Sequence, residues 1–187
     1  MAQPYNIYVV HGYTANSQAN WYPDLKNHLE SENVAIHIFD MPNSHAPVEK
    51  EWLDFLEARI TNFDEKSIYI GHSLGCATIL KFLEDKNTDN IESLFLVSGF
   101  VENSPIPELS EFVKEKINYA KFIKTISNRI VISAEDDDII PYQYSEILAK
   151  KLNAQFNLLR TGKHFIDRDG FIKFLYLTNL IQEMILQ

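Results

Sequence analysis

The chain has 187 residues, 45% of them hydrophobic and 23% charged, and 17 basic against 26 acidic residues give a formal net charge of −9 at pH 7. That composition excludes a disordered, collagen-like or coiled-coil chain, and the length predicts a single domain over residues 1–187. An acidic surface repels phosphate groups, so neither nucleic acid nor an anionic membrane is expected as a partner.

The cysteine content and the N-terminal residues give an indication of the cellular compartment of the protein. Cys76, the only cysteine, has no partner for an internal disulfide, which is usual in a reducing environment. Met1-Ala2-Gln3-Pro4 carries no basic side chain, and no apolar run approaches the roughly 20 residues that cross a bilayer. We therefore expect a cytoplasmic protein.

Short apolar runs alternate along the chain with longer segments whose apolar residues recur every three or four positions. The runs are mostly continuous, as in strands buried on both faces, and strands that alternate with helices predict a parallel sheet. In chain order the predicted strands are Ile7–Val10, Ala35–Phe39, Ser67–Ile70, Ser93–Val97, Arg129–Ser133 and Gln155–Leu159. The predicted helices are, in chain order, Asp24–Leu29, Trp52–Ile60, Leu74–Glu84, Leu109–Ile126, Tyr142–Leu152 and Gly170–Leu186.

The connection from Ser98 to Asn128 is the longest between two predicted strands. It contains Pro105 and Pro107 before its helical stretch. It is too short for a separate cap domain, and it could be either a small lid or an ordinary crossover helix.

The third predicted strand leads directly into Gly71-His72-Ser73-Leu74-Gly75, and a predicted helix follows. This is the G-x-S-x-G pattern of a nucleophile elbow, in which a serine on a sharp strand-to-helix turn exposes its hydroxyl. A tight turn with a capping serine is the structural alternative. We expect His72 to pack beside the turn and Cys76 to be a small core residue.

A serine nucleophile needs a base and an acid, which in such folds follow it in the order acid, then histidine. Of six histidines, only His164 lies after the serine, in the loop that follows the last predicted strand. His45, in an early loop, is a weaker alternative. The acid could be any of four consecutive acidic residues, Glu135 to Asp138, which follow the fifth predicted strand.

Acyl transfer also needs two N–H donors for the oxyanion. The residue after the nucleophile, Leu74, is one candidate, and Tyr13 in the loop after the first strand is the other. Gly12 would let that loop pass close to the serine. His11 and Trp21 are weaker candidates for the wall of a substrate pocket, and core packing is the alternative for Trp21.

These motifs together resemble a minimal α/β-hydrolase, and most closely the small serine hydrolases grouped around retinoblastoma-binding protein 9 and the bacterial YdeN-type proteins. The matching stretches cover nearly the whole chain. They are His11-Gly12-Tyr13 with Trp21, Asp40-Met41-Pro42-Asn43, Trp52, the elbow, Asp137 within Asp-x-x-Ile-Pro141, and Gly162 with His164-Phe165.

The resemblance implies a three-layer αβα sandwich around a mainly parallel six-stranded sheet, without a large cap. The acid of this family stands four residues before the proline, which selects Asp137, with Asp136 and Asp138 as fallbacks. Lys163 departs from the family, which often has paired glycines before its histidine.

The activity implied is that of a carboxylesterase acting on small acyl esters through Ser73, Asp137 and His164, with no cofactor and no metal. A thioesterase or amidase would use the same residues. A protein-interaction module on the same fold is a further alternative, and a protein partner is possible. A nucleotide-binding flavodoxin-like protein would need a phosphate loop, which we do not find.

Overall fold

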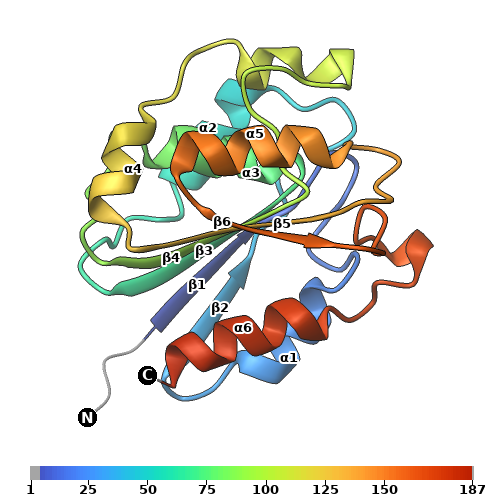
Figure 1. Cartoon of the computed structure of the whole chain (residues 1–187). Coiled ribbons are helices and arrows are strands. Elements are labelled where there is room, and N and C mark those ends of the chain that lie inside the picture. The colour runs from blue at the N-terminus through green and yellow to red at the C-terminus, as the bar shows by residue number, and fades with distance from the viewer. Residues whose placement is uncertain (1–4, 187) are drawn as a thin grey trace.

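A six-stranded, wholly parallel sheet runs through the computed structural model, which describes residues 5–186 (Figure 1). Its strands lie in the order β2-β1-β3-β4-β5-β6. They are β1 (Tyr5–Val10), β2 (Val34–Ile38), β3 (Lys66–His72), β4 (Ile91–Val97), β5 (Asn128–Ala134) and β6 (Gln155–Leu159). Met1 to Pro4, on which the expectation of a cytoplasmic protein partly rests, lie outside the described residues.

Helices cover both faces of the sheet, so the three-layer α/β architecture is confirmed. On one face lie α1 (Tyr22–Leu29) and α6 (Leu175–Ile185), and on the other α2 (Glu49–Glu57), α3 (Leu74–Leu83) and α5 (Tyr142–Leu152) (Figure 1). Alternate residues of β3 serve the two layers: Ile68 and Ile70 face α1 and α6, whereas Tyr69 faces α3.

The strand register brings five strand ends to one edge of the sheet. Val10 pairs with Gly71, His72 with Val97, Val97 with Ile132, and Ala134 with Leu159. The loops that follow β1, β3, β4, β5 and β6 therefore meet at the carboxyl edge, where parallel sheets bind ligands.

The expected helix Leu109–Ile126 is wrong, because the segment folds as two pieces. They are the 3₁₀-helix η1 (Pro107–Val113) and the helix α4 (Tyr119–Thr125). The Asn118 amide donates to the Glu84 carboxylate, and Lys121 donates to the carbonyls of Leu83 and Glu84 at the end of α3. These tertiary hydrogen bonds hold the start of α4 against the C-terminal end of α3, so the helix begins anew there.

The start of the last helix also differs from the expectation. Gly170 does not open α6; it ends the short 3₁₀-helix η2 (Asp167–Asp169) with a left-handed φ of 88°. Phe171 and Phe174 then pack around Phe165, and α6 begins only at Leu175. Aromatic packing therefore delays the helix by five residues relative to the periodic pattern. None of the helices within residues 5–186 is long and apolar enough to cross a bilayer.

Candidate active site

Ser73 stands alone between β3 and α3, in a backbone conformation that few residues adopt. Its φ is 54° and its ψ is −119°, which is a strained geometry for a residue with a side chain. The close approach of α3 to β1 imposes this turn, because a Cβ added at Gly75 would lie 2.0 Å from the Val10 carbonyl oxygen. The strand, turn and helix thus fix the direction of the serine side chain.

The Ser73 side chain lines a cavity of about 480 Å³ at the carboxyl edge of the sheet. The loop after β1 passes directly over it: a Cβ added at Gly12 would lie 2.9 Å from the Ser73 Cβ and 3.5 Å from its Oγ. Other walls come from the loops after β4, β5 and β6. The lining residues are Tyr13, Thr14, Ala15, Asn16, Ala19, Asn20, Ser73, Ile106, Ile139, His164, Ile166 and Asp167.

His164 lines the same cavity and is paired with Asp137. The imidazole Nδ1 lies 2.9 Å from the Asp137 Oδ2 and 3.2 Å from its Oδ1, and both side chains are buried. Because a carboxylate only accepts, Nδ1 carries the hydrogen and Nε2 keeps its lone pair. Within residues 5–186, Nε2 has no hydrogen bond, and Ser73 and His164 share the cavity without bonding each other.

The neighbours of Asp137 in the acidic run have other contacts. Asp137 Oδ1 also accepts the amides of Ile139 and Ile140, which orients the carboxylate. Asp136 instead accepts the amides of Gly162 and Lys163 at 2.9 and 2.8 Å, and these bonds hold its pKa below the usual value. Asp138 is exposed and pairs with Arg168.

The backbone N–H groups of Tyr13 and Leu74, near Ser73, have no acceptor in the described part of the chain. Other amides nearby are bonded: the Thr14 amide donates to the Ser44 carbonyl, and the Cys76 amide donates to the Ser73 carbonyl. Leu74 opens α3, where the helix dipole favours negative charge. The two free amides could therefore stabilise an anion next to Ser73.

Comparison with known proteins identifies the family of this chain. The sequence matches the model of the serine hydrolase family over residues 7–183. The chain belongs to the serine hydrolase family. The YdeN protein of Bacillus subtilis is 35% identical over 167 residues, which cover 88% of each chain. The serine hydrolase RBBP9 of Rattus norvegicus is 25% identical over 170 residues, which cover 88% of this chain and 89% of that protein.

A solved structure extends the likeness to three dimensions. The crystal structure of the ydeN gene product of B. subtilis superimposes with a TM-score of 0.88 and 31% identity, covering 97% of this chain and 99% of that one. The predicted family, α/β-hydrolase fold and hydrolase activity are therefore confirmed.

Two side chains that the sequence suggested as pocket walls of this serine hydrolase lie elsewhere. Trp21 is fully buried, packs edge-on against Tyr22 and contacts Phe174 of the core. His11 is also fully buried: its Nε2 accepts the Met41 amide at 3.0 Å, and its Nδ1 donates to the Gly12 carbonyl at 2.8 Å. His11 therefore supports the loop after β1 from behind and Trp21 belongs to the core, so of the three candidates only Gly12 reaches Ser73.

Several cavity residues were missed by the sequence reasoning. Ile166 and Asp167 follow His164 directly, and Ile139 lies within the Asp-x-x-Ile-Pro stretch, so nearness in sequence could have found them. Ile106 had no such signal, because it reaches the cavity from the Ser98–Asn128 connection. That connection contributes one wall, and η1 beyond it is anchored in the core by Leu109 and Phe112.

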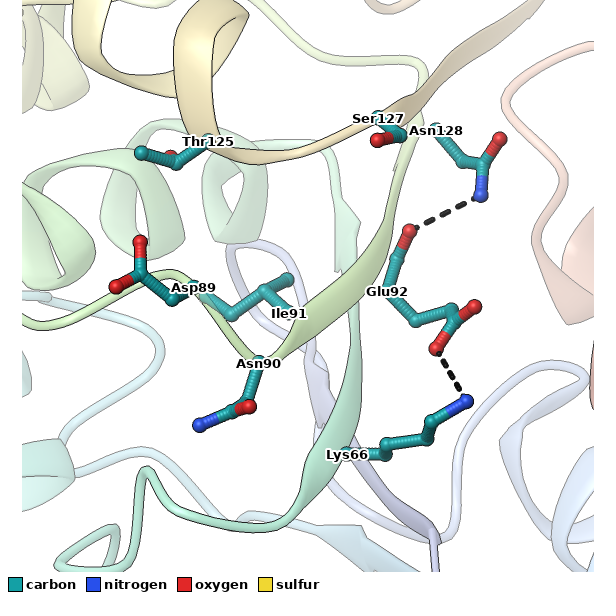
Figure 2. A pocket seen from close by; sticks show the side chains of 8 residues that line it. All are labelled: Lys66, Asp89, Asn90, Ile91, Glu92, Thr125, Ser127 and Asn128. Carbon is teal, nitrogen blue, oxygen red and sulfur yellow. Dashed lines mark hydrogen bonds and ion pairs between the residues drawn. The ribbon is translucent and has the colours of Figure 1, made fainter.

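A second hollow, at the opposite edge of the sheet, is polar (Figure 2). The Glu92 carboxylate pairs with Lys66 at 3.2 Å, and the Asn128 amide donates to the Glu92 carbonyl at 3.1 Å. These groups satisfy one another, and the described residues that line this hollow include no histidine that could activate the hydroxyls of Thr125 and Ser127. The candidate active site is therefore the cavity at the carboxyl edge.

Proposed function

We propose that Ser73, His164 and Asp137 act as a catalytic triad that hydrolyses small acyl esters through an acyl-enzyme. The observation that carries this proposal is the buried His164–Asp137 pair facing the cavity that Ser73 also lines. No other histidine among the described residues lines that cavity.

The proposed steps follow from the protonation of His164. With Nδ1–H donated to Asp137, the Nε2 lone pair takes the Ser73 hydroxyl proton as Oγ attacks the ester carbonyl carbon. The alkoxide leaves with that proton, and an acyl-serine remains. Water then attacks the acyl carbon by the same route, which releases the acid and restores Ser73.

The developing oxyanion would be stabilised by the amides of Tyr13 and Leu74. Both donors are free of protein acceptors within residues 5–186, and fixed N–H groups cost no reorganisation during the reaction. Removing one such donor typically lowers kcat by about 10²–10³-fold. The free amides and the strained turn at Ser73 are consistent with acyl transfer.

The cavity wall supports a small, uncharged acyl group as substrate. Ile106, Ile139 and Ile166 come from three different loops and provide apolar contact, and Ala15 and Ala19 leave room between them. Such a wall favours a short hydrocarbon chain over a charged one. Nothing in the proposed steps needs a metal or a cofactor.

A fluorophosphonate probe tests the nucleophile, because it reacts covalently with an activated serine. We expect the folded wild type to be labelled and Ser73→Ala to remain unlabelled. Turnover of 4-nitrophenyl acetate should fall about 10²–10⁴-fold in His164→Ala, because that variant lacks the general base. A folded wild type that stays unlabelled, or full activity in His164→Ala, would overturn the proposal.

A further inference from the structure

A buried histidine that the proposed mechanism does not use, His72, is bonded to the loop that carries His164. Its Nε2 lies 2.8 Å from the carbonyl oxygen of His164, and its Nδ1 lies 2.7 Å from the Tyr22 hydroxyl. A carbonyl only accepts, so Nε2 carries the hydrogen, and Nδ1 therefore accepts from Tyr22. The surroundings thus select one tautomer of His72.

The same network also reaches the far end of this loop. The Asn20 side-chain amide donates to the Tyr22 hydroxyl at 3.2 Å, and its Oδ1 accepts the Asp167 amide at 3.0 Å. The segment 164–167 is therefore bonded at its first carbonyl and at its last amide to groups from the elbow and from the loop after β1.

His72 remains neutral under ordinary conditions. The groups that face it are Tyr22, His164, Asp137 and His11, and desolvation by burial lowers its pKa to about 3. Burial likewise raises the pKa of the Tyr22 hydroxyl. Since neither group titrates near neutral pH, both hydrogen bonds persist wherever His164 could act as a base.

The backbone around His164 requires such support. Lys163 and Phe165, on either side of it, have left-handed φ values of 49° and 53°. A residue with a side chain in this region costs on the order of 1–2 kcal/mol, so this conformation persists only where its surroundings enforce it. Asp136 bonds the segment before His164, and His72 bonds the His164 carbonyl itself.

We propose that His72, supported by Tyr22 and Asn20, is a positioning residue that holds the His164 loop and thereby sets the distance from the His164 imidazole to Ser73. This inference rests on the proposed function, since it assigns His164 as the base. His72 lies between Gly71 and Ser73, so its side chain joins the turn that carries Ser73 to the loop that carries His164.

Kinetics of matched variants test the role. His72→Leu removes the donor, and we expect kcat for 4-nitrophenyl acetate to fall about 10–100-fold with KM within about twofold, because misplacement by about 1 Å can cost 10²-fold. His72→Gln, whose amide can still donate to the carbonyl, should recover most of that loss. Thr88→Val removes a partly buried hydrogen bond to Thr125, far from the cavity, and should leave kcat unchanged.

Hydrogen exchange gives a readout that does not depend on activity. The Asp167 amide should exchange about tenfold faster in His72→Leu and in Tyr22→Phe, which keeps the ring and the packing, but not in Thr88→Val. Unchanged exchange in both variants, or an unchanged kcat in a folded His72→Leu, would overturn the inference. If the wild type proves inactive on esters while exchange responds as expected, the proposed function fails and the positioning of the loop stands.

Discussion

Four acidic side chains in a row, Glu135 to Asp138, differ in what surrounds each of them. Only the Asp137 carboxylate is fully buried and meets the His164 imidazole. We expect Asp137→Asn to lower kcat for 4-nitrophenyl acetate about 10³–10⁴-fold, because the amide would favour the wrong tautomer of His164. Steady-state kinetics at neutral pH measure the loss.

The two neighbouring aspartates provide matched controls. Asp138→Asn changes an exposed side chain paired with Arg168, so its kcat should equal that of the wild type. Asp136→Asn weakens the bonds to the Gly162 and Lys163 amides, so a loss of about tenfold or less is expected through the loop. An effect of Asp138→Asn as large as that of Asp137→Asn would contradict the assignment.

The sequence predicts the members of the candidate site better than their contacts. Ser73 was found because its motif lies between a strand and a helix, and His164 because no other histidine follows Ser73. Asp137 follows from the family pattern alone, since the consecutive carboxylates differ in burial and in contacts, which depend on the tertiary structure. The contact between His72 and the His164 carbonyl spans 92 positions in the chain, and no local pattern encodes such a bond.

At the scale of elements, the contact between α3 and β1 determines the turn at Ser73. A Cβ added at Gly75 would lie 2.0 Å from the Val10 carbonyl oxygen and 2.9 Å from that of His11. We expect Gly75→Ala to destabilise the protein by about 3 kcal/mol or more, because a strand backbone cannot move aside as a side chain can. Urea unfolding measures this change.

Gly170→Ala is the control for that substitution. Its φ is 88°, but nothing lies within 4 Å of an added Cβ, so only backbone strain of about 1 kcal/mol is expected. Equal losses for the two variants would show that close packing at Gly75 does not matter.

The elements themselves were predicted most accurately where their own sequence decides them. The bounds of α5 and β6 agree with the expectation, because the apolar residues of each segment follow a regular spacing that ends at a definite residue. The segment between β4 and β5 was mispredicted, because contacts of Asn118 and Lys121 with the end of α3 interrupt the helical period. Local patterns contain no information about such distant partners.

That segment also places Ile106 in the cavity wall. Ile106→Ala would remove apolar surface beside a short acyl chain and open room for a longer one. We expect the ratio of kcat/KM for 4-nitrophenyl octanoate over acetate to rise about tenfold, since a methylene contact is worth about 1–3 kcal/mol. Ile123→Ala, on α4 and 39% exposed, should leave the ratio unchanged. An unchanged ratio in Ile106→Ala would exclude Ile106 from the acyl site.

For the whole molecule, the two edges of the sheet differ in chemistry. The carboxyl edge contains the strained turn at Ser73, the left-handed residues around His164 and three buried histidines, His11, His72 and His164. The amino edge holds ion pairs such as Lys66–Glu92 that satisfy one another. Strain and buried titratable groups are therefore concentrated where the chemistry is proposed, and the rest of the fold must stabilise them.

This arrangement makes stability depend on pH. His72 is neutral in the folded protein, where burial lowers its pKa to about 3, while in the unfolded chain it takes a proton near pH 6.5. The unfolded state thus binds more protons between these values, so stability is complete above pH 6.5 and falls as the pH falls. From pH 7 to pH 5 this one group should cost about 2 kcal/mol. Burial lowers the pKa of His11 as well, which acts in the same direction.

His72→Gln separates this effect from all other titrations. The variant has no group that titrates at this position, so its unfolding free energy should fall by about 2 kcal/mol less than that of the wild type between pH 7 and pH 5. Urea unfolding at both pH values, with the same variant and wild type, gives the difference directly. Because His11 and the carboxylates are present in both proteins, their contributions cancel. Equal losses would mean that His72 is protonated in the fold, and a protonated His72 could no longer accept the Tyr22 hydroxyl proton at Nδ1.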